Sequence, residues 1–376
     1  MKIEHDKNHH PRWISTKNPI PLRVVQKEKN EQWLDEINDR ELLERINPDV
    51  GPLMRTVVMI GLDRVHEIIL VISHIIADGT TALNLAKQWL ILAVKSEIIE
   101  CKKKVVAPIE NLIPTKFSND EGRKRLNEQN IRDRKLIEKY RPGRVMPTTQ
   151  IPFELRQSQL IHQELNSYEL TAVVQLSRKN KTTVHGAVTA ALALASAQDA
   201  SVDSDFFAIG SPIDLRRELI PPVSPDEVGS YVATVLSVVD LSKSFWEIAR
   251  EISDDLYDRK QSGHHFNLIT TIAEHSPQSV DVARPFIEFM ESEGPINLVS
   301  SNLGRFPFPN KIGAWDISDA QFLSGISVNG YFVATINSSN NRLFWNFTYI
   351  KHAIPRKRAE DLSENCLRIL REAITT

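Results

Sequence analysis

The sequence predicts a mixed α/β (α+β) fold. Short runs rich in β-branched and aromatic residues, typical of strands, alternate with longer segments whose apolar residues recur at helical spacing. Strands interleaved with helices along a whole chain indicate mixed α/β architecture. The 376 residues, 41% of them hydrophobic and 25% charged, suffice for two domains or one large one of ordinary globular composition.

The first 150 residues carry strand signals followed by a helix signal. Two apolar runs joined by the polar turn Asp63-Arg64 predict two strands, and periodic segments predict two helices, the second beginning near Thr80 or Thr81. The expected helices are 31–46 and 80–99, and the expected strands are 51–62 and 65–74. The stretch 101–150 is rich in Lys, Arg, Asn and Pro. We interpret it as a solvated helix with a linker rather than a binding patch, and place the best domain boundary there.

The second half of the chain continues the alternation. Expected strands are 158–165, 206–215 and 231–241, and expected helices are 167–180, 182–198 and 244–260; the segments 296–306 and 326–350 and a terminal helix at 356–374 complete the chain. The aromatic residues Trp315, Phe344 and Trp345 are expected in the core rather than in a ligand-stacking surface.

Composition and charge exclude several classes of protein. A net charge of −2 gives no electrostatic reason to expect nucleic acid or an anionic membrane as partner. The two cysteines, Cys101 and Cys366, form neither a disulfide framework nor a metal-ligand spacing. The polar start lacks the apolar core of a signal peptide, and no apolar run has the length of a membrane span, so the sequence predicts a cytoplasmic protein without a transmembrane segment. No nucleophile elbow, Walker loop or dinucleotide fingerprint is present.

Two pairs of adjacent histidines do not predict a metal site. His9-His10 and His264-His265 have no carboxylate or cysteine partner at ligand spacing, so no metal site is predicted. His185 is expected to face a packed helix surface.

The stretch VISHIIADGTT (71–81) combines a base, a tight turn and the start of a helix. His74 ends an apolar strand-like run, the pair Asp78-Gly79 is typical of a tight turn, and a helical segment follows. A neutral imidazole held there can take a proton from a hydroxyl or an amine, and the N–H groups of the helix start can help to hold developing negative charge. These residues alone leave two interpretations open, a catalytic base or a structural histidine satisfied by a backbone carbonyl.

Together with SHIIADG, the stretches AIGSPIDLRRELIPPVSPDEVGSY (208–231) and NLVSSNLGRFPFP (297–309) resemble the condensation-domain superfamily of CoA- and carrier-protein-dependent acyltransferases. The resemblance runs from about residue 19 to the end and is closest to the phthiocerol dimycocerosyl transferase type, because of the PIDLR…PPV run, the SSNLG run and the stand-alone length. It implies two chloramphenicol-acetyltransferase-like subdomains, at 1–145 and 146–376. They would meet in a V, with the active site in a tunnel between them.

The resemblance assigns roles residue by residue. His74 matches the catalytic histidine, and Gly79 matches the motif glycine. Asp78 matches the structural aspartate, which points away from the substrate and pairs with an arginine that Arg216 matches. A buried pair of this kind would fix the turn that presents His74.

Three further residues are expected to line the tunnel. Asn302 and Gly304 match the segment of the second domain that borders it. Ser73 stands where peptide condensation domains usually carry the first of two histidines, which favours another acceptor than an amine.

The function that the resemblance implies is acyl transfer from a CoA or acyl-carrier-protein thioester to a small alcohol, with His74 as general base. No nucleophilic Ser or Cys stands beside His74, so no covalent acyl-enzyme is expected. The thioester stores the required energy, so no metal, nucleotide or permanently bound cofactor is needed; acyl-CoA or a phosphopantetheinyl carrier protein is the donor substrate.

Two alternatives remain. The first is an amide-forming nonribosomal peptide condensation domain, which flanking carrier or adenylation domains would support. The second is a non-catalytic, truncated relative that acts as a carrier-protein-docking module. The front end keeps the second open, because members usually begin with a strand, a helix and a further strand before the NPIPLR region, and only about eighteen residues precede it here.

Overall fold

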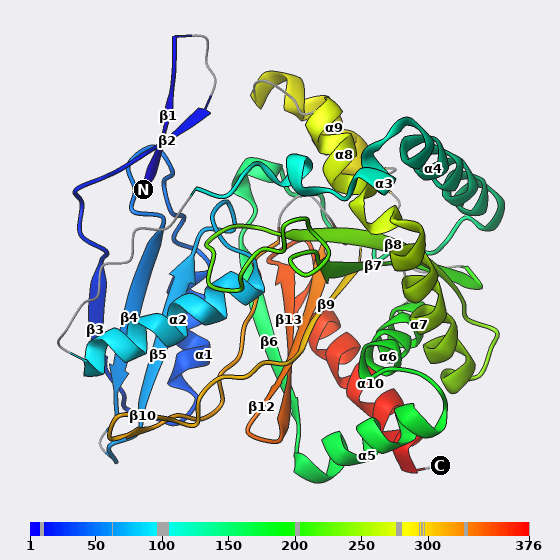
Figure 1. Cartoon of the computed structure of the whole chain (residues 1–376). Coiled ribbons are helices and arrows are strands. Elements are labelled where there is room, and N and C mark those ends of the chain that lie inside the picture. Colours follow the sequence, from blue (N-terminus) through cyan, green and yellow to red (C-terminus); the bar gives the residue numbers. More distant parts are fainter. Residues whose placement is uncertain are drawn as a thin grey trace.

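Two principal β-sheets, each with helices packed against it, make up the computed structural model in Figure 1. The structure describes residues 1–375 except 8–10, 62, 96–104, 200–203, 276–279, 293, 295, 297 and 327–329. The predicted segments 96–99 and 327–329, the pair His9-His10 and Cys101 lie outside the described residues. Strands and helices alternate along the described chain, which confirms the predicted mixed α/β class.

The first sheet has three strands in the order β3-β4-β5, with β3 parallel and β5 antiparallel to β4. Helix α2 crosses this sheet (Figure 1). The elements are β3 (Leu22–Gln26), α1 (Gln32–Glu36), the π-helical turn η1 (Ile37–Glu41), β4 (Met54–Ile60), β5 (His66–Ile72) and α2 (Gly79–Val94). The predictions of β4, β5 and α2 are confirmed.

The predicted helix at 31–46 is only partly present, because α1 passes into the π-helical turn and ends at Glu41. The wider turn buries two polar side chains, Asn38 and Glu41. Glu41 accepts hydrogen bonds from Arg23 Nη2 (2.8 Å) and Arg55 Nε (2.5 Å), which stand on neighbouring strands. The ion pairs of Glu41 with Arg23 and Arg55 hold the π-helical turn against the sheet. A regular α-helix would direct the side chain of Glu41 differently.

The second sheet has six strands in the order β6-β13-β12-β9-β7-β8. Strand β9 is parallel to β12 and β7, and the other neighbours are antiparallel. The strands are β6 (Ser158–Leu165), β7 (Phe206–Asp214), β8 (Val232–Asp240), β9 (Leu298–Arg305), β12 (Phe332–Ser339) and β13 (Arg342–Ile350). The helices against it are α5 (Ser167–Lys179), α6 (Val184–Ala197), α7 (Phe245–Ser262) and α10 (Arg356–Thr375).

The main core lies between this sheet and its helices. Helix α6 is rich in alanine and buried along most of its length, and small side chains let it pack closely against α7 and α10. Phe344 and Trp345 are 1% and 0% exposed, as the sequence predicts. The prediction for Trp315 is wrong: it is 45% exposed, because it stands in a two-residue strand of a surface hairpin rather than in the main sheet.

Several segments join or flank the two sheets. They are β1 (Lys2–His5), β2 (Pro11–Ile14), η2 (Ile109–Leu112), α3 (Thr115–Ser118), α4 (Asp120–Tyr140), η3 (Phe153–Leu155), η4 (His264–Phe266), α8 (Asn267–His275), α9 (Val280–Ser292), β10 (Lys311–Ile312) and β11 (Trp315–Asp316). The hairpin β10-β11 lies against α2, so a segment of the second half reaches across to the first (Figure 1). The division at 145/146 stays a prediction.

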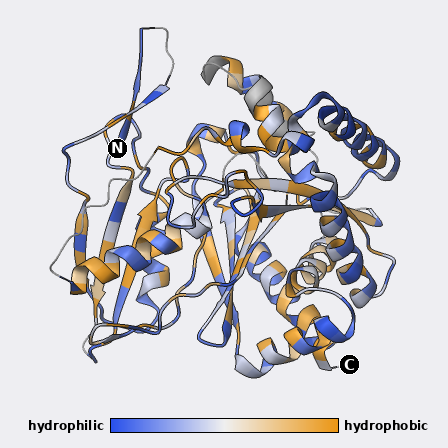
Figure 2. Cartoon of the chain, in the orientation of Figure 1, coloured by the Kyte–Doolittle hydropathy of each residue, from blue (hydrophilic) through white to orange (hydrophobic). Residues whose placement is uncertain are grey.

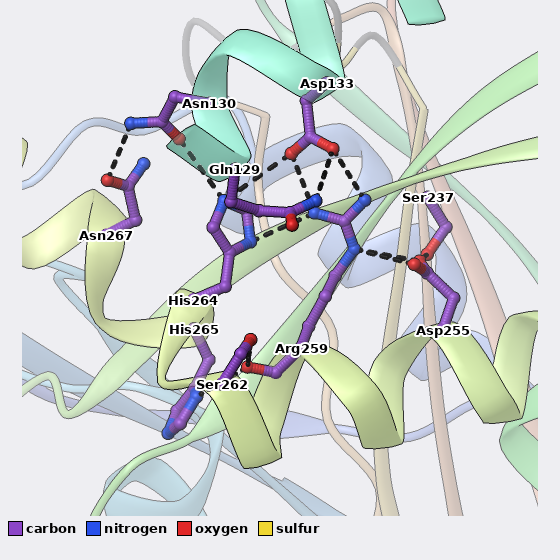
Figure 3. Close-up of polar contacts among 10 residues, drawn as sticks. All are labelled: Gln129, Asn130, Asp133, Ser237, Asp255, Arg259, Ser262, His264, His265 and Asn267. Carbon is purple, nitrogen blue, oxygen red and sulfur yellow. Dashed lines mark hydrogen bonds and ion pairs between the residues drawn. The ribbon is translucent and has the colours of Figure 1, made fainter. Parts of the chain in front are cut away.

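Helix α4 is the predicted solvated helix, and its exposed surface is strongly hydrophilic (Figure 2). Its buried side carries a polar contact as well: Asp133 receives a forked pair of hydrogen bonds from Arg259 of α7 at 2.7 and 2.9 Å (Figure 3). Arg259 also binds Asp255 and His264, both drawn in Figure 3. Burial and the nearby Arg259 charge lower the pKa of His264 to about 4, so this histidine is a neutral member of a structural network.

Among the helices of the described residues, none combines the length and the apolar character needed to traverse a lipid bilayer.

Candidate active site

The stretch VISHIIADGTT (71–81) forms a turn between strand β5 and helix α2. Strand β5 ends at Ile72 and α2 begins at Gly79, so the predicted strand 65–74 extends two residues too far at its end. The turn is fixed at its start, where the Ser73 N–H donates to the carbonyl of Leu53 (2.9 Å). Ser73 itself is partly buried.

His74 lies in this turn and is exposed. No hydrogen bond to its ring is present within the described part of the chain. The following residue, Ile75, is also 52% exposed, so an apolar side chain stands beside the imidazole. The ring is therefore accessible to a substrate, whereas the structural interpretation required a histidine satisfied by a backbone carbonyl.

The ion pair that the resemblance implies is present. Arg216 Nη1 lies 2.8 Å from Asp78 Oδ2, and Arg216 Nη2 donates to Asp78 Oδ1 at 2.9 Å, with the two residues 2% and 5% exposed. The carboxylate also accepts from the backbone N–H groups of Thr81 and Tyr231, both at 2.9 Å. Two charge-assisted bonds and two amide bonds thus satisfy Asp78, and Asp214 gives the guanidinium a second carboxylate at 3.1 Å.

Burial by itself would lower the pKa of Arg216, but the hydrogen bond and the charge of Asp78 raise it above its ordinary value. The Arg216 guanidinium therefore keeps its positive charge in this buried place.

The segment that follows Arg216 clamps the first turn of α2. Thr81 Oγ1 donates to the carbonyl of Gly229 (2.8 Å), and Asn84 Nδ2 donates to the carbonyl of Pro225 (2.8 Å). The backbone N–H of Asp78 also donates to Gly229, at 3.3 Å. The stretch 208–231, more than a hundred residues away in sequence, thereby fixes the turn that carries His74.

The start of α2 is less free to hold negative charge than the sequence indicated. Asp78 is the N-cap residue, and its carboxylate accepts a hydrogen bond from the N–H of Thr81. A helix terminus already capped by a carboxylate offers fewer free donors to a developing oxyanion.

Gly79 lies where the two halves of the molecule meet. A Cβ at this position would stand 3.0 Å from Leu303 Cδ1 and 3.1 Å from Phe322 Cε2, so a larger residue would require these side chains to move by a few tenths of an ångström. Leu303 lies between the predicted residues Asn302 and Gly304 at the end of β9. Asn302 Oδ1 accepts from the N–H of Gly304 (2.7 Å), whose φ of +65° suits glycine. The structure thus brings this segment to the motif turn; its lining of a tunnel stays a prediction.

Sequence reasoning missed Leu303 and Phe322. The SSNLG run pointed to the region of Leu303, but no periodicity or motif marked Phe322, which stands in a segment without regular structure.

The other candidate groups do not join this site. His185 Nε2 lies 3.0 Å from Ser211 Oγ, and burial lowers the pKa of His185 to about 4, which agrees with a histidine on a packed helix surface. No cluster of three or more metal-ligating side chains occurs among the described residues.

Comparisons with known proteins bear on the family and the fold of the chain. Residues 156–319 match the family model described as phthiocerol/phthiodiolone dimycocerosyl transferase C-terminus. No curated protein sequence matches the chain.

Solved structures resemble the chain over nearly its whole length. SgcC5 from Streptomyces globisporus, in complex with (R)-(-)-1-(2-naphthyl)-1,2-ethanediol and sucrose, is 15% identical with a TM-score of 0.65, and the match covers 100% of this chain and 85% of that one. The EpoB cyclization-docking bidomain from Sorangium cellulosum is 13% identical with a TM-score of 0.67, covering 99% and 73%. The epimerization domain from the third module of tyrocidine synthetase B is 13% identical with a TM-score of 0.62, covering 96% and 81%.

The TM-scores show a shared fold at these low identities. With the family model, they confirm the predicted resemblance to the condensation-domain superfamily: its transferase model matches the middle of the chain, and its fold extends over nearly all of it. Condensation-type acyl transfer is the class of activity that this match supports.

Proposed function

We propose that the protein transfers an acyl group from a CoA or acyl-carrier-protein thioester to an alcohol, with His74 as the general base. The observation that carries this proposal is the contrast at the motif turn. Asp78 is buried and fully paired with Arg216, whereas His74, four residues earlier, is exposed and its ring makes no hydrogen bond in the described structure. A rigid turn with an open imidazole suits a base that must meet a substrate proton.

In the proposed reaction, the neutral imidazole takes the proton of the acceptor hydroxyl as the oxygen attacks the thioester carbonyl. The tetrahedral adduct then collapses, the carbon–sulfur bond breaks, and the departing thiolate takes from the imidazolium the proton that came from the alcohol. The products are an ester and a free thiol, and no electrons are exchanged with another reactant. The described turn places no serine or cysteine hydroxyl or thiol on the His74 ring, which supports direct transfer without an acyl-enzyme.

Two observations support an alcohol acceptor and a thioester donor. The family model that matches is that of a dimycocerosyl transferase, and the similar protein SgcC5 was solved with a diol. The resemblance to carrier-protein-dependent synthetase domains supports an acyl-carrier protein as one source of the donor. Ser73 in place of a second histidine adds to the case against an amine acceptor.

Thiol release tests this proposal. Purified protein is incubated with acyl-CoA or acyl-carrier protein, alone and with an alcohol or an amine, and free thiol and the acylated product are measured. Alcohol-dependent thiol release with ester formation is expected. Amide formation would instead identify a peptide-type condensation domain, and binding of carrier protein without any acyl transfer would identify a docking module.

A further inference from the structure

One segment of the second half is hydrogen-bonded to buried side chains of the six-stranded sheet. The return segment (residues 317–326) runs from β11 back to β12 and has no regular secondary structure. It is anchored by three polar residues of the sheet, Thr335, Asn337 and Asn346, which are 0%, 1% and 0% exposed. Buried amides and hydroxyls are costly unless they are hydrogen-bonded, so their partners are part of the design of this region.

These side chains converge on the backbone of Phe322. Asn337 Oδ1 accepts from the Phe322 N–H (3.3 Å), and the Phe322 carbonyl accepts from Asn346 Nδ2 (3.1 Å) and from Thr335 Oγ1 (3.3 Å). Asn337 also donates to the carbonyl of Ala320 (2.9 Å). Both backbone polar groups of Phe322 are thus bound by buried side chains, which fixes the residue independently of its own ring.

The anchored residue directs its ring at the catalytic motif. Phe322 Cε2 and Cδ2 lie 3.1 and 3.2 Å from the position that a Cβ at Gly79 would take, and Leu303 Cδ1 lies at 3.0 Å. Gly79 begins α2, five residues after His74. The exposed side chain of Ile75 stands on the same turn. The residues around the motif turn therefore present apolar carbon, which suits an acyl chain better than a polar acceptor or a pantetheine arm.

We propose that Phe322 is a specificity-determining residue, and that its ring limits the bulk of the acyl group that can lie beside His74. This inference rests on the proposed function. The anchoring of the backbone makes the ring a fixed wall, so shortening the side chain would enlarge the acyl site without releasing the return segment. Leu303, which also lies at the Gly79 contact, adds to this wall.

The test compares acyl-CoA donors of increasing length, from acetyl to hexadecanoyl, with one alcohol acceptor, and follows thiol release. The variants are Phe322→Ala, Phe322→Leu and Phe322→Trp. The matched control is Phe245→Ala, since Phe245 is also partly buried but lies on α7 against the core of the second half. The readout is the ratio of kcat/KM for long and short donors, together with the melting temperature.

Phe322→Ala should raise the long-to-short ratio about 10-fold or more, since pocket contacts of a few methylene groups discriminate by at least that factor. Phe322→Leu should raise it less, and Phe322→Trp should lower it. Phe245→Ala should lower the melting temperature and leave the ratio unchanged. If Phe322→Ala does not fold, the Leu and Trp variants decide by the opposite signs of their shifts.

An unchanged ratio in folded Phe322 variants of an active enzyme would show that the ring only packs, and would overturn this inference while leaving the proposed function intact. A wild-type protein that releases no thiol from any acyl-CoA, nor from acyl-carrier protein, would instead overturn the proposed function, and this inference with it.

Discussion

The side-chain amide of Asn38 makes the two backbone hydrogen bonds with Leu160 that a further neighbouring strand would make. Asn38 Oδ1 accepts from the Leu160 N–H at 2.6 Å, and Asn38 Nδ2 donates to the Leu160 carbonyl at 3.1 Å. Leu160 lies in β6, the edge strand of the second sheet, and Asn38 lies in the π-helical turn against the first. Because both residues are buried, this one side chain satisfies an edge that would otherwise leave two backbone groups unpaired between the halves.

Asn38→Ala should therefore lower the free energy of unfolding by on the order of 3 kcal/mol, because it orphans a buried N–H and a buried carbonyl together. Urea unfolding measures the change. Asn18→Ala is the control: its amide also donates to backbone carbonyls, of Val50 and Gly51, but in an exposed place, and its loss should be within about 0.5 kcal/mol. Equal losses in the two variants would mean that the Asn38 bridge contributes nothing special.

The pair of Asp78 and Arg216 makes a second stability prediction. Asp78→Ala or Arg216→Ala should cost about 3–5 kcal/mol, since each removes one member of a buried ion pair, and the Asp78 variant also frees the N–H groups of Thr81 and Tyr231. Denaturant unfolding gives the change, and activity should fall only with the folded fraction.

The control for this pair is Glu251→Ala, which breaks the solvent-exposed pair of Glu251 with Lys243 and should cost within about 1 kcal/mol. A different result would reassign the buried pair: if Asp78→Ala unfolds like the wild type but has lost all turnover, Asp78 takes part in the chemistry rather than in fixing the turn.

The elements with a clear period were predictable from the sequence, and contacts between distant segments were not. The predicted strand at 158–165 coincides with β6, and the helical spacing in 80–94 predicted most of α2. The ion pair of Asp78 and Arg216 bridges 138 positions. It could be predicted only from the resemblance, since no spacing links the two residues.

The rest depended on side chains that no local pattern marks. Nothing in the period of 31–46 shows that Asn38 leaves the helix to bind a strand, which is why the π-helical turn was missed. The place of Phe322 depends on buried amides of Asn337 and Asn346, and these occur in runs that simply read as strands. Propensity describes the element, whereas the partner of a buried polar group depends on the tertiary structure.

The pH dependence of stability follows from a buried neutral histidine. The pKa of His185 is lowered by burial from 6.5 to about 4. Between these values the unfolded chain binds a proton that the folded chain does not, so the free energy of unfolding should fall as the pH drops from about 6.5 to about 4. The contribution of His185 should be at most about 3 kcal/mol and should level off below the lower value.

His264, whose pKa is also lowered to about 4, adds a slope of the same sign, so a variant must separate the two. His185→Gln stays neutral at every pH and can still reach Ser211 by a hydrogen bond. Urea unfolding of this variant and of the wild type at a series of pH values should show a shallower acid loss in the variant. Parallel curves would mean that His185 takes up its proton in the folded state as readily as in the unfolded one.

The last prediction concerns His74, on which the proposed reaction depends. Because the side chain is exposed, His74→Ala should leave the melting temperature unchanged. General-base catalysis contributes about 10²–10⁴-fold, so alcohol-dependent thiol release should fall by that factor while donor binding persists. His66→Ala, at the other end of β5, removes another exposed imidazole and should keep full activity. If His74→Ala keeps more than about a tenth of the wild-type turnover, well above what loss of a base leaves, His74 is not the base and the mechanism proposed for this turn is wrong.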